Sequence, residues 1–526
     1  MKLSEIFENY PPSLREKLAD IISKAGLTPD LELREFSKKH FEAIAHFMIE
    51  EMTFSERKKF YNDLVKHLQR ERASLLKILE VKAFPKEVSQ AKRKTFEEVY
   101  FKVELDEAKQ EAARCLKCRV PRCVNACPLN FPVPAYLKAV AEGRIDDACK
   151  LALRFMPTQG VCGRICIGYC EKACTLGQIG GEPVRIRAVK RAVADSVRME
   201  KNLPKPKPPS GLRVAIIGSG PAGLTAAYHL RLLGHYVTVF EASEKLGGQL
   251  IRSIPEFRLP SRTVEREVEL VKILGVEFRT SFMLGRDASI DDLFQQGYKA
   301  IFIATGADKP RTLRLKGIEL EGVHLGMELL KKVKKGEKPQ LTGKVRVIGG
   351  GNVAMDVART ALRLGAEEVT IMYRRSREEM PAEEEEIEEA IKEGVEIMFL
   401  VQPIELIGEK GELRKVKCIR MRLGEPGPDG RRKPIPVEGS EFEVEADHVI
   451  FAIGAKPSVD WLSEKDGIEL NEDGTIKVNE KLETSRKGVF AGGDVIRGPS
   501  TYAIATADGI KAAREIDRYL RGLSAL

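Results

Sequence analysis

The chain has 526 residues, 43% of them hydrophobic and 31% charged, which is too long for one ordinary core and predicts several globular domains. Its net charge of +9 comes from basic residues interleaved with nearly as many carboxylates, and its aromatic content is only 6%, so we expect no nucleic-acid partner. No segment approaches the roughly 18 consecutive apolar residues that span a bilayer, and the N-terminus lacks a signal-peptide core, so the expected location is the cytoplasm.

The first region, residues 1–105, repeats apolar side chains at three- and four-residue spacing, as in LREFSKKHFEAIAHFMIEEM. This period predicts helices. The region holds no cysteine and no phosphate-binding loop. We therefore expect a helical extension that serves as a scaffold, with a docking module for a partner subunit as the alternative.

Eight of the ten cysteines fall in the next region, residues 106–200, which we expect to be mostly helical. In a cytoplasmic protein such density indicates metal ligation rather than disulfides. The first run ends in Cys-Pro and resembles ferredoxin spacing, so two [4Fe-4S] clusters are predicted, and two structural zinc sites are the alternative. The candidate ligands are Cys115, Cys118, Cys123, Cys127, Cys162, Cys166, Cys170 and Cys174.

A proline-rich connector, EKNLPKPKPPSG at residues 200–211, then marks a domain boundary. Two βαβ patterns follow it, and strand-like segments at 300–307 and 448–458 flank the second. The second nucleotide domain is therefore expected to be inserted into the first. The predicted fold is α/β, with Rossmann-like domains at 211–325 together with 446–526, and at 326–445.

The first βαβ pattern carries G-x-G-x-x-G at Gly218, Gly220 and Gly223 directly after a strand. These glycines permit a tight turn, a close approach to a pyrophosphate and close packing of helix on strand. Glu241 ends the next strand, where a carboxylate can accept from ribose hydroxyls. This combination predicts an adenine dinucleotide.

FAD is the expected ligand here, because Gly492-Gly493-Asp494 precedes a helix that starts around Thr501. Such an aspartate can bond the ribityl chain or the pyrophosphate, and the positive end of the helix can face the flavin. The candidate contacts are Gly218, Gly220, Ala222, Gly223, Glu241, Gly248, Gln249, Thr305, Gly306, Gly493, Asp494 and Thr501.

The second βαβ pattern carries G-x-G-x-x-A, and its second strand ends in Tyr-Arg-Arg-Ser-Arg without an acidic residue. Guanidinium groups can bind a 2'-phosphate, so NADP(H) is favoured over NAD(H). The alternative is that these arginines form surface ion pairs with the glutamates after Met380; the run EEEEIEE at 383–389 is expected to be a solvated helix face. The candidate contacts are Gly349, Gly351, Asn352, Val353, Arg374 and Arg375.

From about residue 106 to the end, the chain closely resembles the glutamate synthase small subunit family. Similar proteins are the large subunit of NADH-dependent reduced ferredoxin:NADP oxidoreductase and the N-terminal part of dihydropyrimidine dehydrogenase. The resemblance implies a helical iron-sulfur domain, a discontinuous FAD domain with Arg258 near the isoalloxazine, and an inserted NADP domain. The strings that carry it are CLKCRVPRCVNACP, CGRIC, CEKAC, AIIGSGPAGL, IPEFRLP, VIGGGNVAMD, YRRSREEMPA and AGGD.

The resemblance also implies two ligand sets. One cluster would take Cys115, Cys118, Cys123 and Cys174, and the other would take Cys127, Cys166, Cys170 and a Glu or Gln. That last position here is Lys190, which cannot ligate iron while it is protonated. Cys162 as the fourth ligand, a three-iron cluster and an absent cluster are the alternatives.

The expected activity is hydride transfer between the nicotinamide and flavin N5, with no side-chain acid or base, followed by single-electron transfer through the clusters. The expected partner is a second oxidoreductase subunit or ferredoxin in a hetero-oligomer. The alternatives are a stand-alone NAD(P)H diaphorase or sulfide-type reductase, and a non-catalytic scaffold that carries cofactors. The nicotinamide domain has no Cys-x-x-Cys, so a dithiol reductase is not expected.

Overall fold

The computed structural model describes residues 2–8, 10–71, 94–100, 102–427, 429–457 and 459–522. The chain forms two compact units. Unit 1 comprises residues 1–86, 101–205 and 501–507, and unit 2 comprises residues 87–100, 206–500 and 508–526. Within the described residues, no helix combines the length and the apolar character that crossing a bilayer requires.

Unit 1 begins with amphipathic helices, as their apolar spacing predicts. Helix α2 begins after Ser37, whose hydroxyl accepts a hydrogen bond from the His40 amide, and it buries Phe41, Ile44 and Met48. The elements are η1 (Leu3–Phe7), α1 (Pro12–Lys24), η2 (Leu33–Glu35), α2 (Lys38–Glu51) and α3 (Phe54–Glu71).

The cysteine region of unit 1 consists of short helices joined by loops. The longest, α13, buries Ile186, Val189 and Val193 and packs against α6, α8 and α10. The elements are α6 (Leu105–Ala113), α7 (Arg122–Asn125), α8 (Val133–Ala141), α9 (Ile145–Leu153), α10 (Gln159–Ile165), α11 (Tyr169–Lys172), α12 (Thr175–Gln178), α13 (Ile186–Ser196) and η3 (Met199–Asn202).

The N-terminal helices pack onto this cysteine region. A Cβ at Gly180 would lie 2.7 Å from the Lys58 Cα, and one at Gly181 would lie 2.6 Å from the Tyr61 ring, so α3 fits closely against the loop after α12. Glu42 in α2 accepts from the Arg119 amide at 3.0 Å. The N-terminal helices therefore contact the cysteine region, and their role as a scaffold or as a docking module stays a prediction.

Unit 2 contains a parallel five-stranded sheet in the order β15-β4-β1-β2-β3. Strand β15 pairs with β4, so a strand near the C-terminus completes a sheet that begins before the insert. The elements are β1 (Arg213–Ile217), α14 (Pro221–Leu232), β2 (Tyr236–Phe240), α15 (Gln249–Arg252), α16 (Ser261–Ile273), β3 (Glu277–Arg279), α17 (Ile290–Gln295), β4 (Ala300–Ile303), β15 (Val489–Ala491), η6 (Gly493–Ile496) and α21 (Tyr502–Leu520).

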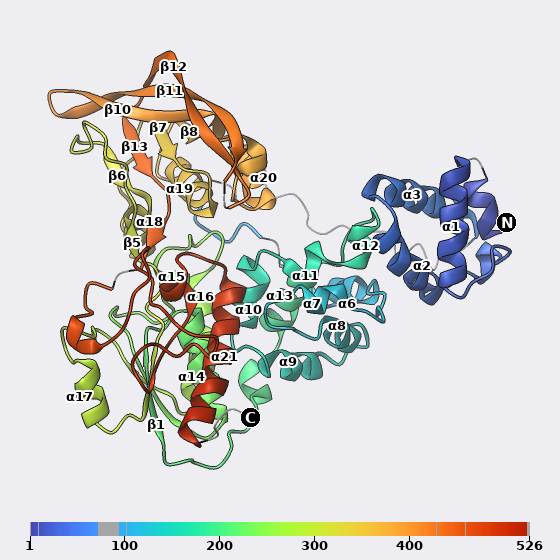
Figure 1. The fold of residues 1–526 in the computed structure, drawn as a ribbon, viewed down its shortest axis with the longest axis horizontal. Coiled ribbons are helices and arrows are strands. Elements are labelled where there is room, and N and C mark those ends of the chain that lie inside the picture. The colour runs from blue at the N-terminus through green and yellow to red at the C-terminus, as the bar shows by residue number, and fades with distance from the viewer. Residues whose placement is uncertain are drawn as a thin grey trace. The chain divides into compact units, whose positions relative to one another are not determined.

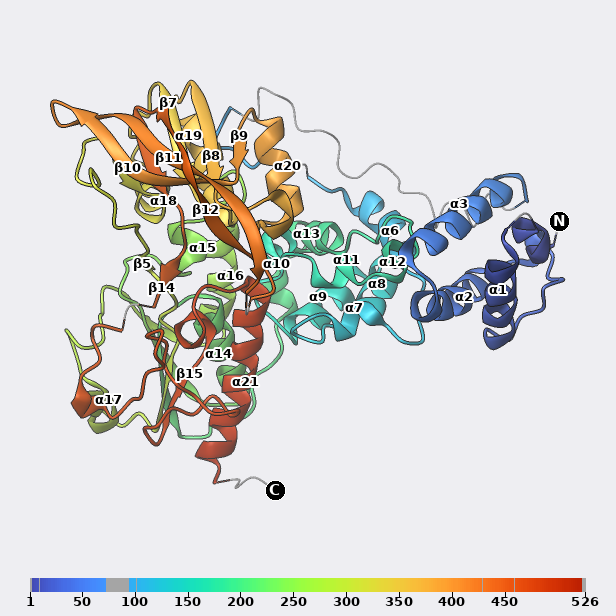
Figure 2. The ribbon, with the colours of Figure 1, turned by 45° about the horizontal axis from the view of Figure 1, so that its top comes forward.

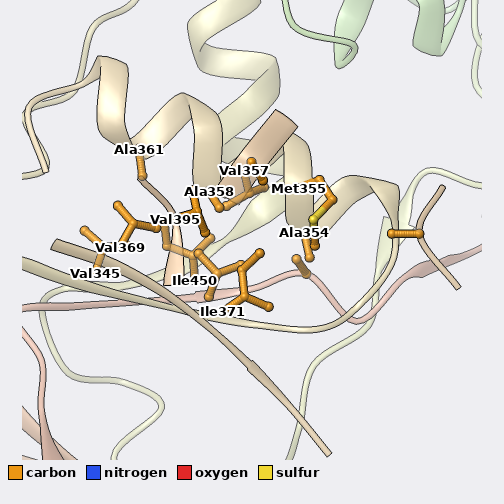
Figure 3. Packing of buried hydrophobic residues seen from close by; sticks show 14 of the residues in the cluster. Val345, Ala354, Met355, Val357, Ala358, Ala361, Val369, Ile371, Val395 and Ile450 are labelled. Carbon is orange, nitrogen blue, oxygen red and sulfur yellow. The ribbon is translucent and has the colours of Figure 1, made fainter. Parts of the chain in front are cut away.

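The intervening residues form a second parallel sheet in the order β6-β13-β7-β8-β9. Figure 3 shows the alanines of α19 facing the apolar side chains of β7, β8 and β13; small residues let this helix approach the sheet closely. The elements are β6 (Val323–Leu325), α18 (Gly326–Lys334), β7 (Lys344–Ile348), α19 (Asn352–Arg363), β8 (Glu368–Tyr373), η4 (Arg377–Glu379), α20 (Glu384–Lys392), β9 (Glu396–Phe399) and β13 (His448–Phe451). This is the inserted α/β architecture expected from the sequence.

An antiparallel three-stranded sheet, which we did not predict, lies beside the second sheet (Figures 1 and 2). It consists of β10 (Val401–Glu409), β11 (Glu412–Pro426) and β12 (Arg432–Glu445), and Cys418 is buried in its core-facing row. Strands β5 (Lys309–Pro310) and β14 (Ala455–Lys456) pair as a short antiparallel ladder. They lie where the chain passes from the first nucleotide fold to the second and where it returns.

A buried charge network connects the two nucleotide folds of unit 2. Arg258, in the loop after α15, donates to both Asp356 oxygens at 2.8 and 2.7 Å, and its Nε lies 3.0 Å from Glu386 Oε1. Arg359 and Arg363 of α19 pair with Glu386 or Glu393 and stack over the Phe257 ring.

This network corrects one expectation. The acidic run at 383–389 does expose Glu384, Glu385 and Glu388, as a solvated helix face should. Glu386, however, is only 5% exposed and accepts a hydrogen bond from the Tyr100 hydroxyl at 3.2 Å. One turn of α20 therefore faces protein rather than water.

Candidate functional site

Four cysteines line one cavity in unit 1, and we call them the first cysteine group: Cys115, Cys118, Cys123 and Cys174. Cys115 and Cys118 follow α6, Cys123 lies in α7 and Cys174 precedes α12. The rest of the cavity wall is mainly apolar, including Val133, Leu137, Leu176, Val184 and Ile186. The structure thus gathers the four cysteines that the resemblance assigns to one cluster.

The thiols of the first cysteine group have raised pKa values because they are buried. Burial raises the pKa of Cys118 to about 11 and that of Cys123 to about 12, so both thiols keep their protons until a metal displaces them. In the described part of the chain, no group of three or more His, Cys, Asp or Glu side chains is arranged to hold a metal ion. The four thiols share a cavity instead, a donor set that suits a cubane.

The second cysteine group consists of Cys127, Cys162, Cys166 and Cys170. All four thiols lie close enough to the buried amine of Lys190 to interact with its charge. The Lys190 Nζ lies 3.7 Å from Cys162 Sγ. The Cys162 thiol hydrogen-bonds to Cys166. This hydrogen bond, together with the positive charges of Lys190 and Arg187, lowers the pKa of Cys166 to about 6. The remaining four candidate cysteines are therefore also neighbours.

The first glycine turn in unit 2 has the geometry of a dinucleotide site. A Cβ at Gly223 would lie 2.0 Å from the Gly218 carbonyl oxygen, so the helix and the turn touch there. A Cβ at Gly220 would meet nothing within 4 Å, and α14 begins at the next residue. The turn therefore leaves open space in front of the N-terminus of α14, which is what pyrophosphate binding requires.

Two polar atoms at this site have no partner among the described residues: Gln249 Oε1 and Thr305 Oγ1, both buried. An unsatisfied buried polar atom costs about 1–3 kcal/mol, so a polar ligand that bonds them would be favoured. Glu241, at the end of β2, accepts from Ser219 N and Oγ at 3.0 and 2.6 Å and from the Ser243 amide at 2.8 Å. Its role towards a ribose stays a prediction.

Asp494 and Thr501 are two further residues that the sequence predicts as flavin contacts. Asp494 accepts from the Ser500 amide and hydroxyl at 3.1 and 2.6 Å, and burial raises its pKa. Thr501 belongs to unit 1, where its hydroxyl lies 3.1 Å from the Tyr169 hydroxyl, and α21 begins at the following residue. Unit 2 contains Ala222, Gly248, Gly306 and Gly493.

The second glycine turn repeats the geometry of the first. A Cβ at Gly349 would lie 2.2 Å from the Ala452 carbonyl oxygen, whereas one at Gly351 would come no closer than 3.9 Å to Pro381. Helix α19 begins at Asn352, whose side-chain oxygen accepts from the Glu383 amide at 2.9 Å, and Val353 is half-buried. A second open helix N-terminus is therefore available to a phosphate.

Arg374 and Arg375 follow β8, and neither forms an ion pair with a described glutamate after Met380. Arg374 is exposed and makes no hydrogen bond or ion pair with any described residue; burial of its inner part and the nearby cations Arg375 and Arg431 lower its pKa. Arg375 donates its Nε to the Arg432 carbonyl at 2.7 Å. The positive charge of Arg374 is therefore open to an anion, whereas the neighbouring Arg375 is buried.

The sequence reasoning missed Arg431, which approaches Arg374 from the turn between β11 and β12. No local motif marks it, because the turn lies far along the chain from the glycine-rich segment. Its side chain also pairs with Asp429 at 2.7 Å.

Two family models match the chain. Residues 212–509 match the pyridine nucleotide-disulphide oxidoreductases, and residues 92–202 match the dihydropyrimidine dehydrogenase domain II with a 4Fe-4S cluster. Together these segments contain both glycine turns and both cysteine groups.

Curated relatives match over most of the chain. The NADP(+)-dependent formate dehydrogenase subunit beta of Moorella thermoacetica is 42% identical over 76% of this chain and 60% of that protein. The NADPH-Fe(3+) oxidoreductase subunit beta of Geobacter sulfurreducens is 37% identical over 76% and 63%, so this chain spans less than two thirds of either relative. The glutamate synthase [NADPH] small chain of Azospirillum brasilense is 35% identical over 82% of this chain and 92% of its own length.

Among solved structures, FprA of Mycobacterium tuberculosis in complex with NADPH matches with a TM-score of 0.51. The match has 20% sequence identity and covers 60% of this chain and 85% of that one. At this identity the likeness concerns the fold alone.

Proposed function

The chain belongs to the pyridine nucleotide-disulphide oxidoreductase family and to the family of glutamate synthase small chains, and on that premise we propose that it is an electron-transfer subunit. It is an NAD(P)H-dependent oxidoreductase with FAD and iron-sulfur centres. In the proposed reaction, electrons pass between NADP(H) and a partner through FAD and [4Fe-4S] clusters.

The observation that carries this proposal is the presence, in one chain, of two open glycine turns and a cavity lined by four thiols. The turns suit two dinucleotides, and the thiols suit a cubane. A hydride carries two electrons, whereas an iron-sulfur cluster accepts one at a time; bound FAD supplies the chemistry that converts between them. All three kinds of site are needed for such a relay.

The roles proposed for the protein's own residues follow from their positions. The first amides of α14 beyond Pro221, which has no N–H, and the amides after Gly351 bind the pyrophosphates of the two dinucleotides at helix N-termini. At the flavin, Gln249 accepts through Oε1 and Thr305 donates or accepts through its hydroxyl, the two buried atoms that have no partner among the described residues. No side chain is required as a general acid or base, so the protein contributes chiefly by positioning.

The proposed partner is a second oxidoreductase subunit or ferredoxin, within a cytoplasmic hetero-oligomer. This is supported by the relatives' names, which are those of a beta subunit of formate dehydrogenase and a small chain of glutamate synthase. A stand-alone diaphorase is the competing proposal. It predicts full turnover with soluble acceptors after the cysteine groups are removed.

The test is reduction of the purified whole chain by NADPH under anaerobic conditions. We expect the flavin absorbance band to bleach and an iron-sulfur EPR signal to follow. A flavin band that survives excess NADPH would overturn the proposal, and bleaching without any EPR signal would favour the diaphorase.

The double variant Arg374→Ala/Arg375→Ala is expected to lose its preference for NADPH. Hydrogen bonds to charged groups contribute about 1.5–3 kcal/mol, so the KM for NADPH should rise by tenfold or more, with little change for NADH. The measurement is steady-state flavin-dependent reduction of a dye with each nucleotide. The control is Arg377→Ala, because that side chain is already paired with Glu384. An unchanged ratio of the two KM values would refute the assignment.

A further inference from the structure

Lys190 is buried, and its amine forms no ion pair with a carboxylate among the described residues. It lies on α13, is 3% exposed, and its Nζ sits 3.7 Å from the Phe131 ring centroid. The nearby Asp195 and Glu171 pair with Arg164 at 2.9 Å and Arg187 at 2.7 Å. A buried charge needs a close opposite charge, and these carboxylates already have one.

The groups that act on Lys190 are thiols. The Lys190 Nζ lies 3.7 Å from Cys162 Sγ, and the Cys162 thiol in turn hydrogen-bonds to Cys166. A lysine in this position becomes favourable once these sulfurs carry negative charge.

We propose that Cys127, Cys162, Cys166 and Cys170 bind a second [4Fe-4S] cluster, with Cys162 as its fourth ligand and Lys190 as a fixed counter-charge beside it. This deepens the proposed function, on which it rests. Each thiol releases its proton as its Fe–S bond forms, while Lys190 keeps its own. Four thiolates leave the site net negative, and reduction adds one more negative charge.

The counter-charge has a consequence for the potential of the cluster. Net charge and hydrogen bonds to sulfur are among the factors that set cluster potentials, and a charge in a buried site acts more strongly than it would in water. Lys190 stabilises the reduced cluster more than the oxidised one, because the reduced form carries more negative charge. The second cluster therefore has a higher potential than it would have beside a neutral side chain.

The first experiment removes the charge. The whole chain is purified anaerobically, poised electrochemically without nicotinamide and followed by EPR. In Lys190→Met we expect the reduction equilibrium of the second cluster to become at least tenfold less favourable, about 59 mV for one electron, with the first cluster unchanged. Lys190→Arg, which keeps the charge, should keep the potential. An unshifted second cluster in Lys190→Met would overturn the role of Lys190.

A reciprocal control is available at the first cysteine group. Lys38 lies close enough to Cys115 and Cys118 to interact with their charge, and its Nζ donates to the Ala113 carbonyl at 3.0 Å. Lys38→Met should lower the potential of the first cluster and spare the second. A shift of the same size at both clusters in either variant would mean that the effect is not local, and it would count against the proposal.

The second experiment tests the fourth ligand by iron and sulfide analysis. The wild-type chain should hold about eight iron atoms per FAD, four for each cluster. Cys162→Ala should lose the second EPR signal or convert it to a three-iron signal, whereas Cys149→Ala, a buried cysteine outside both groups, should keep both signals. About four iron atoms per FAD in the wild type, or an unaltered second signal in Cys162→Ala, would overturn the inference. Because neither measurement uses NADPH, a failure here is distinct from failed flavin reduction.

Discussion

Gly220→Glu is expected to leave the chain folded but unable to retain FAD. The Gly220 backbone is extended, with φ at −70°, so any residue can adopt it, and a Cβ there meets nothing within 4 Å. The new carboxylate therefore enters the space that we assign to the pyrophosphate. Two charges about 4 Å apart repel by about 4 kcal/mol at an effective dielectric constant near 20, so FAD affinity should fall at least a hundredfold.

Two variants control this result. Gly220→Ala places a methyl group in the same space but adds no charge, so it should lower FAD affinity far less than Gly220→Glu does. Gly223→Ala places a Cβ 2.0 Å from the Gly218 carbonyl oxygen and should lower the free energy of unfolding as well as FAD content. Flavin absorbance per chain and circular dichroism separate the two effects. Full flavin loading in Gly220→Glu would contradict the site assignment.

Arg258→Met is expected to destabilise unit 2 by about 3–5 kcal/mol, the usual cost of removing one partner from a buried ion pair. Arg258 is 7% exposed, and its loss leaves the Asp356 carboxylate and part of the Glu386 charge unneutralised in the protein interior. The measurement is the free energy of chemical unfolding.

A double-mutant cycle identifies the source of this effect. Arg258→Met/Asp356→Asn should recover part of the lost stability, because the second change removes the stranded charge. Lys477→Ala, which breaks an exposed pair with Glu469, should change stability far less. A loss below about 1 kcal/mol in Arg258→Met would show that the network contributes little.

The sequence predicted the glycine turns because everything that defines them is local. Strand, turn and helix are consecutive, and α14 and α19 each begin within one residue of a glycine of the motif. The α/β fold and the inserted second sheet were also predictable, from the order of the strand-like segments. The domain limits and the cofactor contacts of single residues stay predictions.

Features that depend on distant partners were not predictable. Glu386 looks like its neighbours in an acidic run, and its burial depends on Arg258, Arg359 and Tyr100, all distant from it in the sequence. Arg431 is brought near Arg374 by the turn of an antiparallel sheet. The apolar and polar residues of its strands alternate too weakly for the sheet to be recognised from the sequence. For Lys190, the sequence showed a residue unsuited to ligate iron, but not its distance to Cys162.

The pairing of β15 with β4 has a consequence for how the protein is made. During synthesis, the whole inserted fold leaves the ribosome before β15 does. Until Val489 can pair with Ile301, one edge of β4 therefore stays unpaired. An open sheet edge is a template for aggregation, and the contiguous insert can fold during that interval. We expect a chain that stalls within the insert to need chaperone protection, whereas one that stalls after β15 should not.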